Sequence, residues 1–311
     1  MLYEIDWVLD KLAWMREHDI WPNGARYLWT DAFGVVLLVS LYEELGDEVL
    51  LDRAQWVVGR VDRVLGRARG VRIGEAPDRD GQYFHYLAMW IYALDQLGRH
   101  LPEYHDQAVA LVGEIHRPFV TPGRGVNWKM TDDLAGPYPG YGYGVVDAFH
   151  GYVVYRQLDE DEVLSQEIEE MADLVEKQYR DLHVTQDLAL GLMLWISHFY
   201  PEEQWAKTLC RRALTTLDAM WIDPPGYVAR QPHMPTTKFR FTNYGVSIGL
   251  QAVSEYPDRV RRINAFCDHY TSGDEYDTNP ITHVMGCNSH FPGRLIRPTA
   301  APRRSLERPR L

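Results

Sequence analysis

Four aspartates are candidates for acid–base chemistry because each lies at the start of a long apolar segment. Asp31 follows Trp29 and precedes "AFGVVLLV", and Asp147 precedes "AFHGYVV". Asp80 and Asp187 hold similar places in "RDGQYFHYL" and "TQDLALGL". A carboxylate at such a boundary is either buried with a partner or faces a wet cavity. The residue types therefore allow paired-carboxylate catalysis, in which one group is the general acid and the other the base or nucleophile.

We take Asp31 and Asp147 as the first catalytic pair, with Asp187 and Asp80 as substitutes. A structural role competes, because Asp, Asn and Thr are preferred N-cap residues and acids suit the start of a helix. For Asp80 and Asp187 the two interpretations are about equally supported. If Asp31 faces a site, Asp31→Asn should abolish activity and leave the fold intact.

Two histidines offer a second chemistry. His85 and His150 lie about one turn inside successive apolar segments, at matching places. A single core histidine is more often a satisfied polar group than a catalyst. A matched pair is better explained by a site, since histidine is the usual proton shuttle near neutral pH. His85 and His150 could take and return a proton next to a sugar carbonyl, as a sugar epimerase or isomerase requires.

Aromatic and polar side chains gather on the same segments and the loops that precede them. Such rings could simply plug one end of a fold, or they could stack on sugar rings while polar groups hold the hydroxyls. The candidate substrate-binding residues are Trp29, Glu75, Tyr83, His85, Trp128, Lys129, His150, Asn243 and Tyr244.

The elements that must position these residues are helices of two alternating kinds. Half-exposed helices with one apolar stripe are predicted at 4–18, 47–68, 103–119, 160–179, 202–221 and 257–270. Segments that are apolar on nearly every side follow them at 27–45, 81–97, 144–158, 186–200, 242–256 and, less clearly, 280–291. A helix that is apolar all round belongs inside a large protein.

Strict alternation at a period of roughly 50 residues indicates a repeat architecture. Six such hairpins close naturally into an all-α (α/α)6 barrel, in which the first turns of the inner helices share one open mouth. We expect one domain over residues 1–290, a Pro/Arg-rich tail over 291–311, and short strands in the mouth loops near 121–130 and 226–242.

Composition excludes several classes of protein. The net charge of −12 argues against nucleic-acid or anionic-membrane partners. No apolar run reaches the ~18 residues of a membrane span, and the first residues do not form a signal peptide. Three cysteines without CxxC spacing suit a reduced, cytoplasmic setting. They also argue against a metal site, and the sequence contains no cofactor motif. The expected partner is a small molecule, with no cofactor.

The starts "LWTDAFGV", "DGQYFHYL", "DAFHGY" and "QDLALGL" resemble those of the six-hairpin glycosidase superfamily. The resemblance covers residues 1–290 and concerns architecture. Its style is closest to unsaturated glucuronyl hydrolases and to the N-acylglucosamine 2-epimerase group. It implies a carbohydrate-active enzyme with its site at the barrel mouth. Hydrolysis by paired carboxylates is the first expectation, and epimerisation by His85 and His150 is the alternative.

Two other functions fit the composition of such a barrel. An aromatic, acid-lined barrel could shelter a carbocation during terpenoid cyclisation, although the chain has no DDxxD or DxDD run. A module that only binds or scaffolds is the non-enzymatic alternative. It predicts that removing the mouth carboxylates leaves ligand affinity unchanged.

Overall fold

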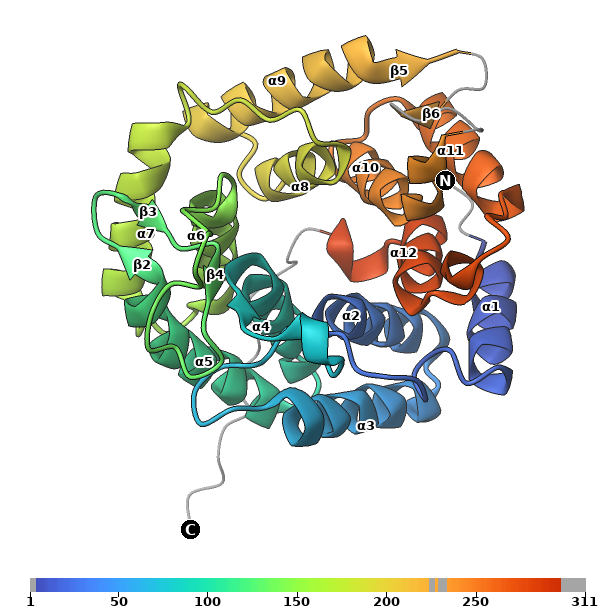
Figure 1. Cartoon of the computed structure of the whole chain (residues 1–311), viewed down its shortest axis with the longest axis horizontal. Coiled ribbons are helices and arrows are strands. Elements are labelled where there is room, and N and C mark those ends of the chain that lie inside the picture. The colour runs from blue at the N-terminus through green and yellow to red at the C-terminus, as the bar shows by residue number, and fades with distance from the viewer. Residues whose placement is uncertain (1–3, 224–226, 229–233, 298–311) are drawn as a thin grey trace.

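A computed structural model describes residues 4–223, 227–228 and 234–297 of the chain. Its helices form two concentric rings, as Figure 1 shows, and the two rings alternate along the sequence. The chain is therefore the six-hairpin (α/α)6 barrel that the sequence predicts. The inner ring consists of α2 (Leu28–Leu45), α4 (Phe84–Gly98), α6 (Asp147–Leu158), α8 (Asp187–Ser197), α10 (Phe241–Ala252) and α12 (Pro280–His290).

The outer ring is amphipathic because each of its helices covers the inner ring on one side only. In α3, for example, Leu50, Ala54, Val57 and Val61 are buried, while Asp52 is exposed and Arg53 and Arg60 are half-buried. The outer helices are α1 (Ile5–Glu17), α3 (Glu48–Leu65), α5 (Pro102–Phe119), α7 (Ser165–Gln178), α9 (Gln204–Met220) and α11 (Pro257–His269).

The inner helices pack side by side, and α12 packs against α2 to close the ring. Glycine permits the closest of these approaches. A Cβ atom added at Gly191 of α8 would collide with the backbone of α10 at Gly245, and one added at Gly249 would collide with Gly191. No side chain therefore fits between α8 and α10 at this level.

The described parts of the connections from each outer helix to the next inner helix lie at one end, the mouth (Figure 1). These connections hold 3-10 turns and short antiparallel strand pairs, so the predicted minor strands are confirmed. The pairs are β1 (Gln82–Tyr83) with β4 (Lys129–Met130), β2 (Val120–Thr121) with β3 (Gly125–Val126), and β5 (Trp221–Ile222) with β6 (Tyr227–Val228). The 3-10 turns at this end are η1 (Pro77–Arg79), η2 (Pro235–Phe239) and η3 (Glu275–Thr278).

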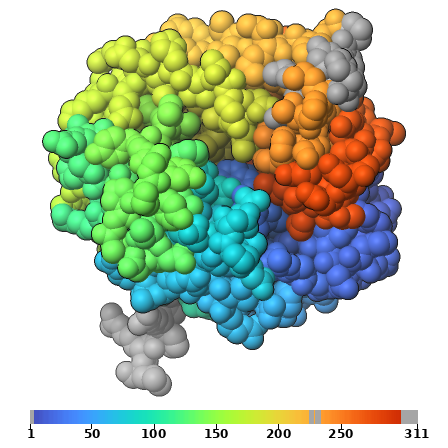
Figure 2. Space-filling view, in the orientation of Figure 1, coloured from blue at the N-terminus to red at the C-terminus, as the bar shows by residue number. Residues whose placement is uncertain are grey.

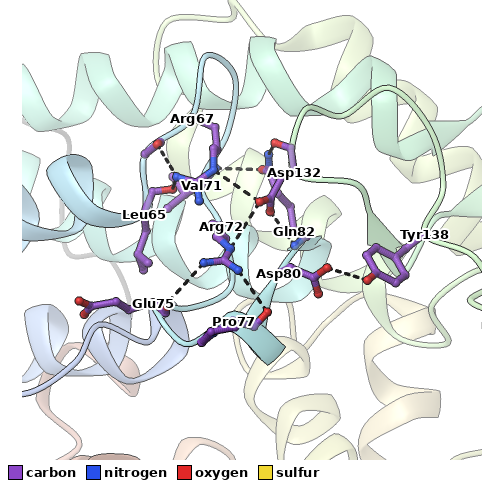
Figure 3. A network of polar contacts seen from close by, with 12 residues as sticks. Leu65, Arg67, Val71, Arg72, Glu75, Pro77, Asp80, Gln82, Asp132 and Tyr138 are labelled. Carbon is purple, nitrogen blue, oxygen red and sulfur yellow. Dashed lines mark hydrogen bonds and ion pairs between the residues drawn. The ribbon is translucent and has the colours of Figure 1, made fainter.

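Asp132 ties two of the mouth loops together, as Figure 3 shows. Its carboxylate accepts the Gly81 amide hydrogen at 2.6 Å and lies 3.4 Å from the Arg72 guanidinium and 3.7 Å from that of Arg67. Gln82 donates to the Asp132 carbonyl at 2.8 Å. The loop after β4 is therefore fastened to the loop before α4, which carries the residues discussed below.

The other end of the barrel is closed by the chain that follows α12. Phe291 and Leu295 are buried, and the turn η4 (Gly293–Leu295) packs against α2. The indole of Trp195 donates to the Leu295 carbonyl at 2.7 Å, and the Tyr92 hydroxyl donates to that of Arg294 at 2.6 Å. The packed domain thus continues past the expected boundary at residue 290 to residue 297. The rest of the predicted tail, 298–311, lies outside the described residues.

Within the described residues, no helix is both long and apolar enough to cross a membrane. Cys210 and Cys287 are free thiols.

Candidate active site at the barrel mouth

The mouth face carries a central hollow between the cyan, yellow and orange-red parts of the chain, which Figure 2 shows. Below it the barrel axis is lined by apolar side chains and glycines from α2, α4, α8, α10 and α12, including Trp29, Phe33, Met89, Leu188, Trp195 and Met285. Polar chemistry is therefore confined to the rim of the hollow, where the inner helices begin.

His85 and Asp147 meet at this rim. His85 is the second residue of α4, Asp147 is the first residue of α6, and these helices pack together. The His85 Nδ1 atom lies 3.5 Å from an Asp147 carboxylate oxygen. Neither atom has a hydrogen bond of standard geometry to any part of the chain that the structure describes, although both are buried. A Cβ atom at Gly144 would overlap the Asp147 carboxylate, so the loop needs glycine there.

His150 lies beneath this pair on α6. Its side chain is 0% exposed, and its ring packs edge-on against Trp195 of α8. Burial, with a smaller contribution from the nearby His85, lowers the pKa of His150 to about 3, so the imidazole stays neutral at physiological pH. Neither ring nitrogen has a hydrogen-bond partner among the described residues. Burial of a polar group in this state costs free energy.

Aromatic rings surround His85 on several sides. The centroid of its ring lies 4.7 Å from that of Tyr86, 5.3 Å from that of Tyr83 and 5.8 Å from that of Trp29. Trp128 stacks nearly parallel to it at 6.3 Å and is 41% exposed. The predicted residues Trp29, Tyr83, Trp128 and His85 therefore form one wall, which we call the aromatic wall. It has the flat faces that sugar rings stack on.

Lys129 and Asp80 support this wall from behind. The Lys129 ammonium lies 3.7 Å from the centroid of Tyr138 and 5.5 Å from that of Tyr83, and it pairs with Asp80 at 3.3 Å. The Tyr138 hydroxyl donates to Asp80 at 2.6 Å, and this bond is the main cause of the lowered pKa of Asp80. Both charges thus have partners within the protein, which favours a supporting role over contact with a substrate.

Asp187 lies at the start of α8, in contact with α10. Its carboxylate accepts the Thr242 hydroxyl at 2.8 Å and the Asn243 amide at 3.4 Å. Tyr244 is turned away from the hollow, because its hydroxyl donates to Asp268 of the outer helix α11 at 2.7 Å. Asp187 and Asn243 thus form a second polar group at the mouth, and Tyr244 belongs to the packing behind it.

The structure does not place Asp31 where the sequence predicts it. The Asp31 carboxylate accepts hydrogen bonds from the Trp21 indole and the Arg26 guanidinium, each at 3.0 Å, and its side chain is 1% exposed. Trp21 also packs against Gly34, one turn further along α2. Trp29 and Phe33 face the barrel axis, so Asp31 is on the opposite side of α2, toward the outer ring.

Glu75 is likewise part of the framework. Its carboxylate accepts the Arg26 backbone amide hydrogen at 3.0 Å and so fastens the loop before α4 to the turn before α2. Two further aromatic residues were not predicted from the sequence: Tyr86, which directly follows His85, and Tyr27, whose hydroxyl contacts that of Tyr86. Both belong to aromatic-rich stretches, and their spacing from Trp29 and His85 is the signal that could have identified them.

No group of three or more histidine, cysteine and acidic residues that could hold a metal ion occurs within the described ranges. The residues at the mouth thus offer acid–base groups, neutral hydrogen-bonding groups and aromatic faces.

Structural comparison finds the same fold in solved proteins. The chain is similar to the family 76 α-mannanase of Bacteroides thetaiotaomicron, with a TM-score of 0.66 and 10% identity over 94% of this chain and 96% of that one. It is similar to cellobiose 2-epimerase from Bacillus thermoamylovorans, with a TM-score of 0.62 and 13% identity over 87% and 88% of the two chains. A D-mannose isomerase gives a TM-score of 0.58 and 11% identity over 87% and 88%.

No protein-family model matches the chain, and no curated protein matches it by sequence. At these identities the likeness shows the (α/α)6 fold, while activity must be argued from the site.

Proposed function

We propose that the protein is a carbohydrate-active enzyme that moves protons at the His85–Asp147 pair. One observation carries the proposal: the His85 Nδ1 atom and an Asp147 carboxylate oxygen are buried at the rim of the hollow, 3.5 Å apart, without standard hydrogen bonds to the rest of the described chain, and beside the aromatic wall. Buried polar groups in a framework normally find partners. Groups left without them next to a hollow are suited to bind a ligand.

The reaction this geometry supports best is isomerisation or epimerisation of a reducing sugar. Asp147 orients His85 through Nδ1 and leaves Nε2 for the substrate. His85 takes the proton from the carbon next to the carbonyl, and the electron pair moves to the carbonyl oxygen to give an enediolate. When the enediolate turns its other face to His85, return of the proton to the same carbon re-forms the carbonyl and gives the epimer. Return of the proton to the former carbonyl carbon, with the neighbouring hydroxyl proton moving to the enediolate oxygen, gives the isomer. His150 supplies a neutral imidazole beneath the pair.

The structural neighbours support a sugar substrate, because they are named as an epimerase, an isomerase and a mannanase. Hydrolysis is the second candidate, and a specific observation favours it. Asp147 and Asp187 are the first residues of neighbouring inner helices, so both carboxylates lie at the mouth. They replace the Asp31–Asp147 pair, because Asp31 faces the outer ring.

The test is a reaction panel in deuterated water. Wild-type protein is incubated with glucose, mannose, cellobiose and α-1,6-mannobiose, and the products are followed by NMR. Deuterium at carbon 2 with a changed sugar supports proton transfer next to the carbonyl. Release of monosaccharides without that label supports hydrolysis. Asp147→Asn should stop either reaction, and Asp52→Asn, on the exposed side of α3, should not.

Binding without turnover, unaffected by Asp147→Asn, would contradict enzymatic function and favour the binding-module alternative. Conversion of isoprenoid diphosphates with no reaction of any sugar would favour cyclisation.

We also propose a cellular location and a kind of partner. The free thiols of Cys210 and Cys287 suit a reducing compartment such as the cytoplasm, and the net charge of −12 suits a small-molecule substrate better than nucleic acid or an anionic membrane. Fractionation of the native host cell would test the location.

A further inference from the structure

A second cavity opens on the mouth face beside the candidate site. It has a volume of about 680 Å³ and lies between the turn before α2, the first turn of α2, the 3-10 turns η2 and η3, and the start of α12. This is the size of a pocket that holds a small organic ligand. None of the residues assigned to the reaction lines it, so the proposed chemistry leaves it unexplained. We call it the side cleft.

The side cleft and the candidate site share a wall. Thr30 lines the cleft, and its neighbour Trp29 contacts His85. Tyr27 also lines the cleft, and its hydroxyl contacts that of Tyr86, whose ring packs edge-on against His85. A ligand that extends from His85 across this wall would therefore enter the side cleft.

The lining of the cleft suits a neutral sugar. The rings of Phe239 and Tyr276 pack edge-on at 4.9 Å and form one side of it. The Arg79 guanidinium lies over the ring of Tyr27 at 5.1 Å and has a half-exposed side chain. Thr30 is 2% exposed, and its hydroxyl has no hydrogen-bond partner in the described part of the chain. Aromatic faces with a few hydroxyl-binding groups are the usual composition of a ligand pocket.

We propose that the side cleft binds a second sugar residue of the substrate, so that the enzyme acts on a disaccharide or longer chain in preference to a monosaccharide. The inference rests on the proposed function, because the reacting sugar is the one placed at His85. Tyr276 acts as the stacking platform of this subsite, and Thr30 hydrogen-bonds a sugar hydroxyl.

The test compares one-unit and two-unit sugars in the same protein. Binding of glucose, cellobiose, mannose and α-1,6-mannobiose to Asp147→Asn protein is measured by calorimetry, and kcat/KM is measured with wild type. Tyr276→Ala should weaken disaccharide binding about 5- to 30-fold, and Thr30→Val about 2- to 10-fold. Both should leave monosaccharide binding unchanged. Tyr104→Ala, on the outer helix α5, is the matched control for tyrosine removal.

The outcomes separate the subsite from the reaction. A disaccharide preference that Tyr276→Ala removes supports the subsite. If that preference is found but no sugar is converted, only the proposed function is contradicted. Turnover with equal kcat/KM for one and two units, unchanged in Tyr276→Ala, overturns the subsite and leaves the reaction standing. No binding of any of the four sugars overturns both. Melting temperatures of the variants exclude loss of fold as the cause.

Discussion

Two buried polar clusters in this barrel differ in whether their members pair with one another. Between α10, α11 and α12, Asn264 accepts the hydroxyl hydrogens of Ser289 at 2.6 Å and Ser247 at 3.2 Å, and Gln251 donates to the Ser289 carbonyl at 2.8 Å. At the mouth, His85, Asp147 and His150 gather without such bonds.

The difference separates framework from site. A paired cluster gains the hydrogen-bond energy that offsets burial, so it holds helices together. A cluster without partners loses stability and is explained only if something else supplies the bonds. The same criterion assigns Asp31, which has three hydrogen-bond donors, to the framework. Breaking each cluster in turn tests this reasoning.

The largest effect is expected at Asp147. Asp147→Asn keeps the size of the side chain but removes its charge, so it should lower kcat/KM by about 10²- to 10⁴-fold. The melting temperature should barely change, because no described hydrogen bond of standard geometry to this oxygen is lost. Steady-state kinetics and thermal unfolding of the same sample check both parts. A large fall in melting temperature would show that Asp147 belongs to the framework.

At Asp31 the large effect should appear in stability. Asp31→Ala leaves the buried Arg26 guanidinium without its counter-charge, which should lower the free energy of unfolding by about 3 to 5 kcal/mol. Asp31→Asn keeps an acceptor oxygen and should recover part of that loss. The folded fraction of either variant should keep its activity, contrary to the expectation from the sequence. Urea unfolding and activity per folded molecule together decide between a structural and a catalytic role for Asp31.

Asp31 also predicts a pH dependence. Burial raises its pKa to about 6 despite Arg26, compared with about 4 in the unfolded chain. Between these values the folded state holds the proton more tightly, so this group's contribution to stability falls as pH rises from about 4 to about 6. The stability of wild type relative to Asp31→Asn should therefore decrease over that window. A stability difference between wild type and Asp31→Asn that stays constant or increases over this window would contradict the raised pKa of Asp31.

A smaller loss is expected in the paired cluster. Asn264→Leu removes the acceptor for Ser247 and Ser289 and should lower the free energy of unfolding by about 1 to 3 kcal/mol. Activity per folded molecule should not change, because the cluster lies away from the mouth. Asn23→Leu, at an exposed position, is the control. Loss of activity without loss of stability would show that pairing does not mark framework.

The smallest change in stability is expected at His150. His150→Leu replaces an imidazole without described partners by an apolar group of similar size, so stability should be unchanged or higher. Activity should fall. His116→Leu is the matched control, because His116 is also buried but bonds Glu170 at 3.2 Å, and there stability should drop. Equal destabilisation of the two variants would remove the distinction between the clusters.

The sequence predicted the ring of helices because its information is periodic and local. Apolar segments and amphipathic segments alternate, and this pattern alone fixes inner and outer layers. The same pattern also predicted that His85, Asp147 and His150 lie at the mouth. It could not orient Asp31, since a helix that is apolar on every side does not reveal which side faces the axis. That orientation depends on Trp21 and Arg26, which the preceding turn places behind α2.

The side cleft could not be predicted from the sequence, for a related reason. Its walls come from segments as far apart as Tyr27, Arg79 and Tyr276. No local pattern indicates that η2 and η3 meet the turn before α2. Lys129 was predicted at the mouth, but its partner Asp80 depends on how loops from two hairpins pair through β1 and β4.

The turn η4 has a consequence for how the molecule is made. It joins the end of the described chain to α2, α4 and α8, through Ser40, Tyr92 and Trp195. Contacts of such long sequence separation form late. During synthesis the apolar edge of the first hairpins stays exposed until about residue 297 has emerged from the ribosome. Nascent chains of this protein that are shorter than that should bind chaperones, and release should follow once η4 is available.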